Sequence, residues 1–172
     1  MDDCAFCRTP RPKTDADMLA MVQARVVKKD PVAINCLGDK YFHGGLGLKK
    51  DMQKAVELWT EAAELGSLDA IFALGISHEY GNGVRRDIAK ATELYKKAAM
   101  QGHVQSRLNL GCCEGKKGNH DCAVRHFLLS AKMGDMNSVE NIREAFVRGL
   151  ATKEQYAAAL KGYQNAVEET KS

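Results

Sequence analysis

Apolar residues recur every three or four positions through most of the chain, which is the spacing of one buried stripe on a helix. The first helix should be capped by Thr14 or Asp15 and end near Lys28-Lys29. Asp30 should cap the next one, with Pro31 in its first turn. Further helices are predicted in pairs: 31–42 with 52–65, 68–80 with 88–100, 104–114 with 120–133, and 139–147 with 153–167.

One sequence pattern occurs twice in the chain, with the two copies 36 positions apart. Its residues Asp51, Ala55, Trp59, Ala62-Ala63 and Gly66 reappear as Asp87, Ala91, Tyr95, Ala98-Ala99 and Gly102. Such a fixed period indicates stacked structural repeats. In each copy the aspartate suits a helix start, the alanine pair allows close packing, and the glycine suits a left-handed helix end. We expect the two aromatic residues to be core residues.

A Leu-Gly pair marks the opening helix of each of the first three predicted helix pairs, at Gly38, Gly75 and Gly111. Glycine inside a helix costs about 1 kcal/mol relative to alanine, so each glycine indicates a close helix crossing. The third pair is degenerate: its loop is shorter, it lacks the Gly-x-Gly turn, and Ser130 replaces the first alanine of the pair. The last pair has no Leu-Gly and reads as a terminal cap, with Thr152 and Gln155 forming a capping box.

The motif Ala-x3-Leu-Gly, Gly-x-Gly, Asp-x3-Ala-x3-aromatic-x2-Ala-Ala-x2-Gly in residues 70–102 resembles the Sel-one-like repeat, a relative of the tetratricopeptide repeat. Residues 33–66 carry it with one extra loop residue, and residues 106–134 carry it in part. The resemblance implies an all-α fold, a right-handed superhelix of antiparallel helix pairs, and a scaffold that binds proteins without catalytic residues. The expected divisions are an extended tail (1–13), a capping helix (14–29), three repeats (30–66, 67–102, 103–134) and a capping helix pair (135–172).

The segment Cys4-Ala5-Phe6-Cys7-Arg8 resembles the closing Cys-Pro-x-Cys-Arg of a RING zinc finger. Ala5 stands where that family has proline, and the other zinc ligands would lie upstream of Met1. A structural zinc site takes four ligands, so Cys4 and Cys7 form an incomplete remnant, and zinc is expected only with an upstream finger. The alternative function is therefore the substrate-recruiting C-terminal part of a RING-type ubiquitin ligase whose finger is truncated or lost.

By analogy with tetratricopeptide repeats, the first helix of each pair lines the concave face of the superhelix. Counting from each Leu-Gly gives one stripe, polar in the first repeat and apolar in the next two. We expect it to bind an extended or helical peptide, unless Phe72 and Leu108 turn inward and belong to the core. The predicted groove residues are Asn35, Asp39, Phe72, Ile76, Glu79, Leu108 and Cys112.

A metal site is conceivable in the third helix pair, because Cys122 and His126 lie four residues apart on one helix face. The other candidates are Cys112, Cys113 and His120. However, Cys122 aligns with Lys54 and Lys90 and should face solvent, and adjacent cysteines point about 100° apart on a helix. We therefore favour free thiols, with no metal and no other cofactor.

Composition and charge disfavour several classes of function. The formal charge is +3 and the basic residues are scattered, which disfavours a nucleic-acid surface. No apolar run approaches a membrane span of about 20 residues, and Met1-Asp2-Asp3 lacks a signal-peptide core. No catalytic constellation is visible. We expect a cytoplasmic or nuclear protein-binding adaptor, a monomer or weak homodimer, that binds a protein or peptide and no nucleic acid or membrane.

Overall fold

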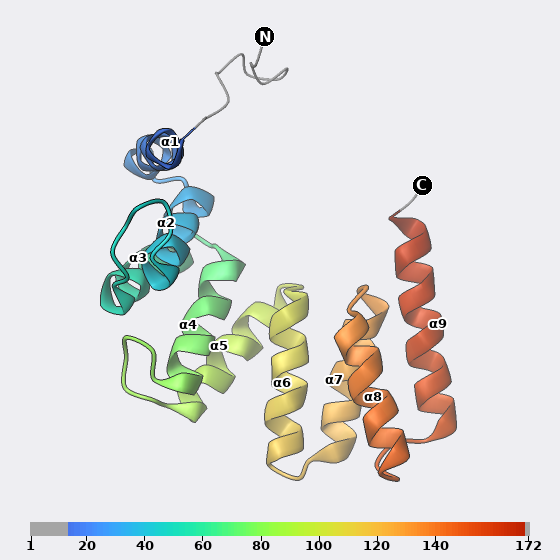
Figure 1. Ribbon diagram of the computed structural model, residues 1–172. Coiled ribbons are helices and arrows are strands. Elements are labelled where there is room, and N and C mark those ends of the chain that lie inside the picture. Colours follow the sequence, from blue (N-terminus) through green and yellow to red (C-terminus); the bar gives the residue numbers. More distant parts are fainter. Residues whose placement is uncertain (1–13, 171–172) are drawn as a thin grey trace. The chain divides into compact units, whose positions relative to one another are not determined.

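Helices and short loops make up the whole of the part that the computed structural model describes, residues 14–170 (Figure 1). Nine helices and no strand occur in that range, which confirms the all-α prediction. The helices are α1 (Asp15–Val27), α2 (Pro31–His43), α3 (Met52–Glu64), α4 (Leu68–Tyr80), α5 (Ile88–Met100), α6 (Val104–Lys116), α7 (His120–Lys132), α8 (Met136–Val147) and α9 (Lys153–Glu169). The chain divides after Asp87 into two compact units, which we call the N-terminal unit and the C-terminal unit.

Helix starts in the N-terminal unit are capped by the residues that the sequence indicates. The Asp30 carboxylate accepts hydrogen bonds from the Val32 and Ala33 amides, and the Asp51 carboxylate accepts one from the Lys54 amide. Thr14 caps α1 through a capping box with Asp17. These side chains satisfy backbone donors that have no partner inside the helix, so the helix starts are fixed locally.

The loops that follow α2 and α4 close in the same way. Gly44 and Gly81 end the two helices in the left-handed conformation, with φ of 76° and 78°. Each loop then returns to its helix: the amide of Asp51 donates to the Tyr41 carbonyl, and that of Asp87 donates to the His78 carbonyl. The repeat thus encodes both the loop and the start of the helix after it.

Close contact between α2 and α3 explains the glycine inside α2. A Cβ at Gly38 would lie 2.6 Å from Nε1 of Trp59, which is 4% exposed. Ala55 and Ala62 of α3 are fully buried in the same unit. The predicted close crossing at Gly38 and the core position of Trp59 are therefore confirmed.

The C-terminal unit repeats this contact between α6 and α7, where a Cβ at Gly111 would lie 2.6 Å from Cε1 of Phe127. Phe127 stands where Trp59 and Tyr95 stand in the first two repeats. Thr152 and Gln155 form the predicted capping box of α9. One core cluster of this unit is formed by Leu108, Ala123, Phe127, Ala131, Val139, Ile142 and Ala159.

Two glycines of α6 should respond oppositely to alanine. Gly111→Ala places a methyl group against Phe127 and 3.2 Å from the Ala123 carbonyl oxygen, and overpacking of this kind costs about 1–3 kcal/mol. Gly115→Ala, one turn later, meets only the Ala123 methyl group at 3.7 Å, an ordinary contact. The free energy of unfolding, measured by urea titration and circular dichroism, should fall for Gly111→Ala and rise by up to about 1 kcal/mol for Gly115→Ala. Stabilisation by both substitutions would contradict the close crossing.

Candidate functional site

A pocket of about 550 Å³ lies in the N-terminal unit. Asn35 and Asp39 of α2 line it together with Phe72 and Ile76 of α4, and Trp59 of α3 also lines it. We call it the α2–α4 pocket. Its full lining is Asn35, Asp39, Phe42, His43, Trp59, Asp69, Phe72, Ala73, Ile76 and Ser77.

The apolar lining of the α2–α4 pocket includes a residue of the core, Trp59. The ring centroids of Phe42 and Trp59 lie 5.4 Å apart in a tilted arrangement. Trp59 is buried, whereas Phe72 and Ile76 are half-buried and so leave part of their surface open. A pocket lined by aromatic side chains and partly open apolar residues is suited to an apolar or amphipathic group.

Polar atoms in the same pocket are incompletely paired. Oδ1 of Asp39 accepts a hydrogen bond from Nε1 of Trp59 at 3.1 Å, while burial raises the pKa of the Asp39 carboxyl. Within residues 14–170, the buried atoms Oδ1 of Asn35 and Oγ of Ser77 have no hydrogen-bond partner. A buried polar group without a partner costs about 1–3 kcal/mol, so these atoms would gain from a ligand or water that bonds to them.

Four predicted groove residues, Asn35, Asp39, Phe72 and Ile76, lie together in this pocket. Glu79 and Leu108 do not lie on an open face: each is 8% exposed. Glu79 follows the buried Gly75 by one helical turn and shares its face, which explains its burial. Leu108 precedes Gly111 by three residues, faces α7 and belongs to the core, so the prediction that it lines a groove is wrong.

Sequence reasoning missed six of the residues that line the pocket. Asp69 could have been found, because it lies three and seven positions before Phe72 and Ile76 on the same helical stripe. Ser77 gave no signal, since a serine beside a Leu-Gly motif is an ordinary helix residue. Trp59 was assigned to the core, and it is both a core residue and part of the pocket wall.

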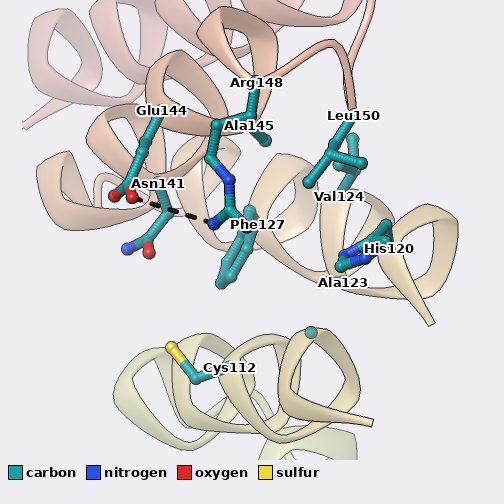
Figure 2. Close-up of a pocket in the computed structure, with 11 residues that line it drawn as sticks. Cys112, His120, Ala123, Val124, Phe127, Asn141, Glu144, Ala145, Arg148 and Leu150 are labelled. Atoms are coloured by element: carbon teal, nitrogen blue, oxygen red, sulfur yellow. Dashed lines mark ion pairs between the residues drawn. The ribbon is translucent and has the colours of Figure 1, made fainter. Parts of the chain in front are cut away.

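Cys112, the remaining predicted groove residue, lies in a smaller pocket of about 260 Å³ in the C-terminal unit (Figure 2). Ala123, Val124 and Phe127 of α7 give this pocket an apolar wall, and Asn141, Glu144 and Arg148 of α8 contribute polar groups. The ion pair between Glu144 and Arg148 is 4.0 Å long and both side chains are well exposed, so it contributes little to stability. Among the described residues, no side chain that lines this pocket has a buried nitrogen or oxygen without a hydrogen-bond partner.

The candidate metal residues do not assemble. Across residues 14–170, no three His, Cys, Asp or Glu side chains form a group that could hold a metal ion. Cys113 is buried, Cys122 is exposed, and the neighbouring Cys112 is half-buried, as the rotation between adjacent helical positions requires. Burial lowers the pKa of His126, with help from the nearby Arg107 cation. Cys4 and Cys7 lie outside the described residues, so the RING-like remnant stays a prediction.

None of the helices between residues 14 and 170 combines the length and the apolar character that a membrane span needs.

Comparison with protein families identifies the repeat. Three consecutive segments, residues 31–67, 68–103 and 104–135, match the family model described as Sel1 repeat, and together they cover more than half of the chain. The chain belongs to the Sel1 repeat family. The resemblance inferred from Asp51–Gly66 and Asp87–Gly102 is thereby confirmed, and Sel1 repeats typically form scaffolds for protein–protein interaction.

Two crystal structures share the Sel1 repeat fold with this chain. One is a Sel1 repeat protein from Oxalobacter formigenes, with a TM-score of 0.75 and 23% identity over 90% of this chain and 64% of that one. The other is a protective antigen present in uropathogenic Escherichia coli strains and displaying an SLR fold, with a TM-score of 0.73 and 30% identity over 88% of this chain and 33% of that one. This chain thus spans less than two thirds of the length of either structure. Comparison with curated proteins gives no match.

Proposed function

We propose that this chain is a non-catalytic adaptor that binds a segment of a protein partner in the α2–α4 pocket. The observation that supports this is the convergence of Asn35, Asp39, Phe72 and Ile76 from two different repeats on one pocket. Two of these residues supply apolar surface and two supply polar atoms, one of which is buried and unpaired. A partner segment would cover the apolar walls and pair the free oxygen.

The pocket suits recognition better than chemistry. Asp39, the half-buried acid of the lining, accepts its hydrogen bond from the Trp59 indole, which is not a nucleophile. A general acid or base needs a nucleophilic partner or a substrate atom within hydrogen-bond reach. Apolar walls with a few polar atoms are typical of a site that orients a bound group.

The test is a cross-linked pull-down with the parent chain and Phe72→Glu/Ile76→Glu as baits. Two carboxylates on the half-buried walls should repel an apolar segment, so capture of the specific partner should fall about ten-fold or more. The segment of that partner is then synthesised, and its binding to both proteins is measured by fluorescence anisotropy. Retained circular dichroism and a cooperative melt must show that the variant is folded.

A matched control adds the same two charges elsewhere. Met100 and Val147 are 76% and 79% exposed, so Met100→Glu/Val147→Glu should leave capture unchanged. If the pocket variant does not fold, Phe72→Ala/Ile76→Ala replaces it, because it removes the apolar walls without introducing charge. A folded pocket variant that binds the purified segment as tightly as the parent would move binding away from this pocket and overturn the proposal.

A further inference from the structure

Helix α1 has the register of the second helix of a repeat pair. Thr14 caps α1 as Asp51 caps α3, 37 positions later, and both helices are 13 residues long. After α1, Lys29 adopts a left-handed φ of 57° at the position where Gly66 follows α3 with φ of 92°. The Sel1 repeat match begins at residue 31, so α1 stands directly in front of it, where the second half of a repeat would stand.

The same face is buried in α3 and open in α1. The residues that α3 buries are Ala55, Leu58, Trp59 and Ala62. The residues at the same register in α1, which we call the open stripe, are Met18, Met21, Val22 and Arg25. No residue of α1 is buried, and Met18 and Met21 are 38% and 45% exposed. In α3 this face packs on α2, the first helix of its pair, and residues 14–170 contain no first helix in front of α1.

The last helix of the C-terminal unit does not leave such a stripe open. Ala159 of α9 is buried, and Tyr156, Leu160 and Tyr163 pack against the core cluster of that unit. No large hydrophobic side chain of α9 is exposed within residues 153–169. The terminal repeats of a stacked array need a polar outer face to stay soluble. Helix α1 departs from this rule, so its open stripe favours contact with another helix.

The open stripe is symmetrical about the midpoint between Met21 and Val22. Met18 lies as far before this midpoint as Arg25 lies after it. Contact about a two-fold axis needs such a surface, because residue i of one copy meets residue j of the other and the reverse holds as well. In an antiparallel pair of α1 helices, Met21 would meet Val22 of the second copy, and Met18 would meet the aliphatic stem of Arg25. The Arg25 guanidinium can stay on Asp30, to which it donates two hydrogen bonds.

Charge sets the direction of this pair. The first turn of α1 carries Asp15 and Asp17, whereas its last turn and C-cap carry Arg25 and Lys28. Antiparallel packing brings the acidic end of one copy beside the basic end of the other, and parallel packing would bring like charges together. It also places the two helix dipoles in opposition. Exposed charges contribute little binding free energy, so they select the direction while the apolar contacts of the stripe supply most of the association.

We propose that the open stripe of α1 is a self-association surface, on which α1 of a second copy packs antiparallel. The open stripe shares no residue with the α2–α4 pocket, so the inference does not depend on the proposed function. Methionine side chains are flexible and adapt their shape to a partner. Because one short helix per copy buries less than the roughly 1,200–2,000 Å² of a stable complex, the dimer should be weak and reversible.

The test measures the mass of the full chain by sedimentation equilibrium over a wide range of protein concentration. The parent should rise from 18.9 kDa towards twice that mass as its concentration approaches the millimolar range. Met18→Glu/Met21→Glu places two carboxylates in the stripe and should raise the dissociation constant about ten-fold or more. A parent chain that stays at its monomer mass, or a dimer that persists unchanged in this variant, would overturn the inference.

The matched control adds the same charges to the same unit. Val27 and Val32 are 82% and 65% exposed and lie outside the open stripe, so Val27→Glu/Val32→Glu should dimerise as the parent does. An equal loss in both variants would reduce the effect to overall charge and reject the stripe. Circular dichroism and a cooperative melt must show that each variant is folded. If Met18→Glu/Met21→Glu is not, Met18→Gln/Met21→Gln replaces it, because glutamine makes the stripe polar without adding charge.

Cross-linking tests the direction of packing. An isotope-labelled chain with p-benzoylphenylalanine in place of Met18 is mixed with unlabelled parent chain and irradiated, and mass spectrometry identifies peptides that join a labelled copy to an unlabelled one. Antiparallel packing predicts attachment around Arg25 of the unlabelled copy. Attachment around Met18, as parallel packing requires, or attachment outside α1, would overturn the inference.

Discussion

Trp59→Ala should lower the free energy of unfolding of the N-terminal unit by about 3–5 kcal/mol, the usual cost of removing a large aromatic side chain from a packed core. Trp59 is 4% exposed, lies against Gly38 and Phe42, and donates a hydrogen bond to Asp39. Its removal leaves a cavity at the α2–α3 crossing and takes away the donor of a half-buried carboxylate. Because Trp59 is the single tryptophan of the chain, unfolding must be followed by circular dichroism in urea and not by fluorescence.

A double-mutant cycle with Gly38 tests the reason for this loss. In the parent chain, Gly38→Ala should be destabilising, because its Cβ would lie 2.6 Å from Nε1 and 2.7 Å from Cδ1 of the indole. In the Trp59→Ala chain that clash is gone, and alanine is the better helix former by about 1 kcal/mol. Gly38→Ala should therefore cost far less there, or even stabilise. Equal effects of Gly38→Ala in the two chains would show that the indole does not explain the glycine.

Helix positions and the crossing glycines could be predicted because each depends on local chemistry. The caps at Asp51 and Thr152 follow from side chains that pair with nearby amides, and the glycines at 66 and 102 adopt φ of 92° and 91° as a left-handed helix end requires. The repeat period then predicted which helices pack against each other as pairs. Most helix ends agree with the prediction within one to three residues.

The pocket was harder to predict. Periodicity gives the face of the helix on which a side chain lies, but not how far the neighbouring helices cover that side chain. Counting from Leu-Gly placed Phe72 and Leu108 at equivalent positions relative to the motif, two residues before the leucine. In the structure Phe72 is half-buried in a pocket wall, whereas Leu108 is a core residue beside Phe127. The degenerate third repeat has the same backbone pattern with different packing. The periodicity of one sequence does not show this difference in packing.

Gly83→Ala should lower the stability of the N-terminal unit by about 3 kcal/mol, from two separate costs. Gly83 has φ of 72°, a left-handed conformation that costs alanine roughly 1–2 kcal/mol. A Cβ on Gly83 would also overlap the carbonyl oxygen of Met52, the first residue of α3, and would lie 2.8 Å from its carbonyl carbon; backbone cannot move aside as a flexible side chain can. The loop after α4 must then lift from the start of α3. The loss can be followed by the fluorescence of Trp59 in urea.

Gly47→Ala is the matched control for this prediction, because the repeat supplies the same residue 36 positions earlier. Gly47 has nearly the same φ, 75°, but a Cβ on it would meet nothing within 4 Å. Gly47→Ala should therefore show only the conformational cost of about 1–2 kcal/mol, and the difference between the two variants measures the contact of the loop with α3. Equal losses would mean that glycine at this repeat position is required for its conformation alone. A larger loss for Gly83→Ala would assign the second glycine of the Gly-x-Gly turn a packing role, in which one repeat holds the first turn of α3 in the repeat before it.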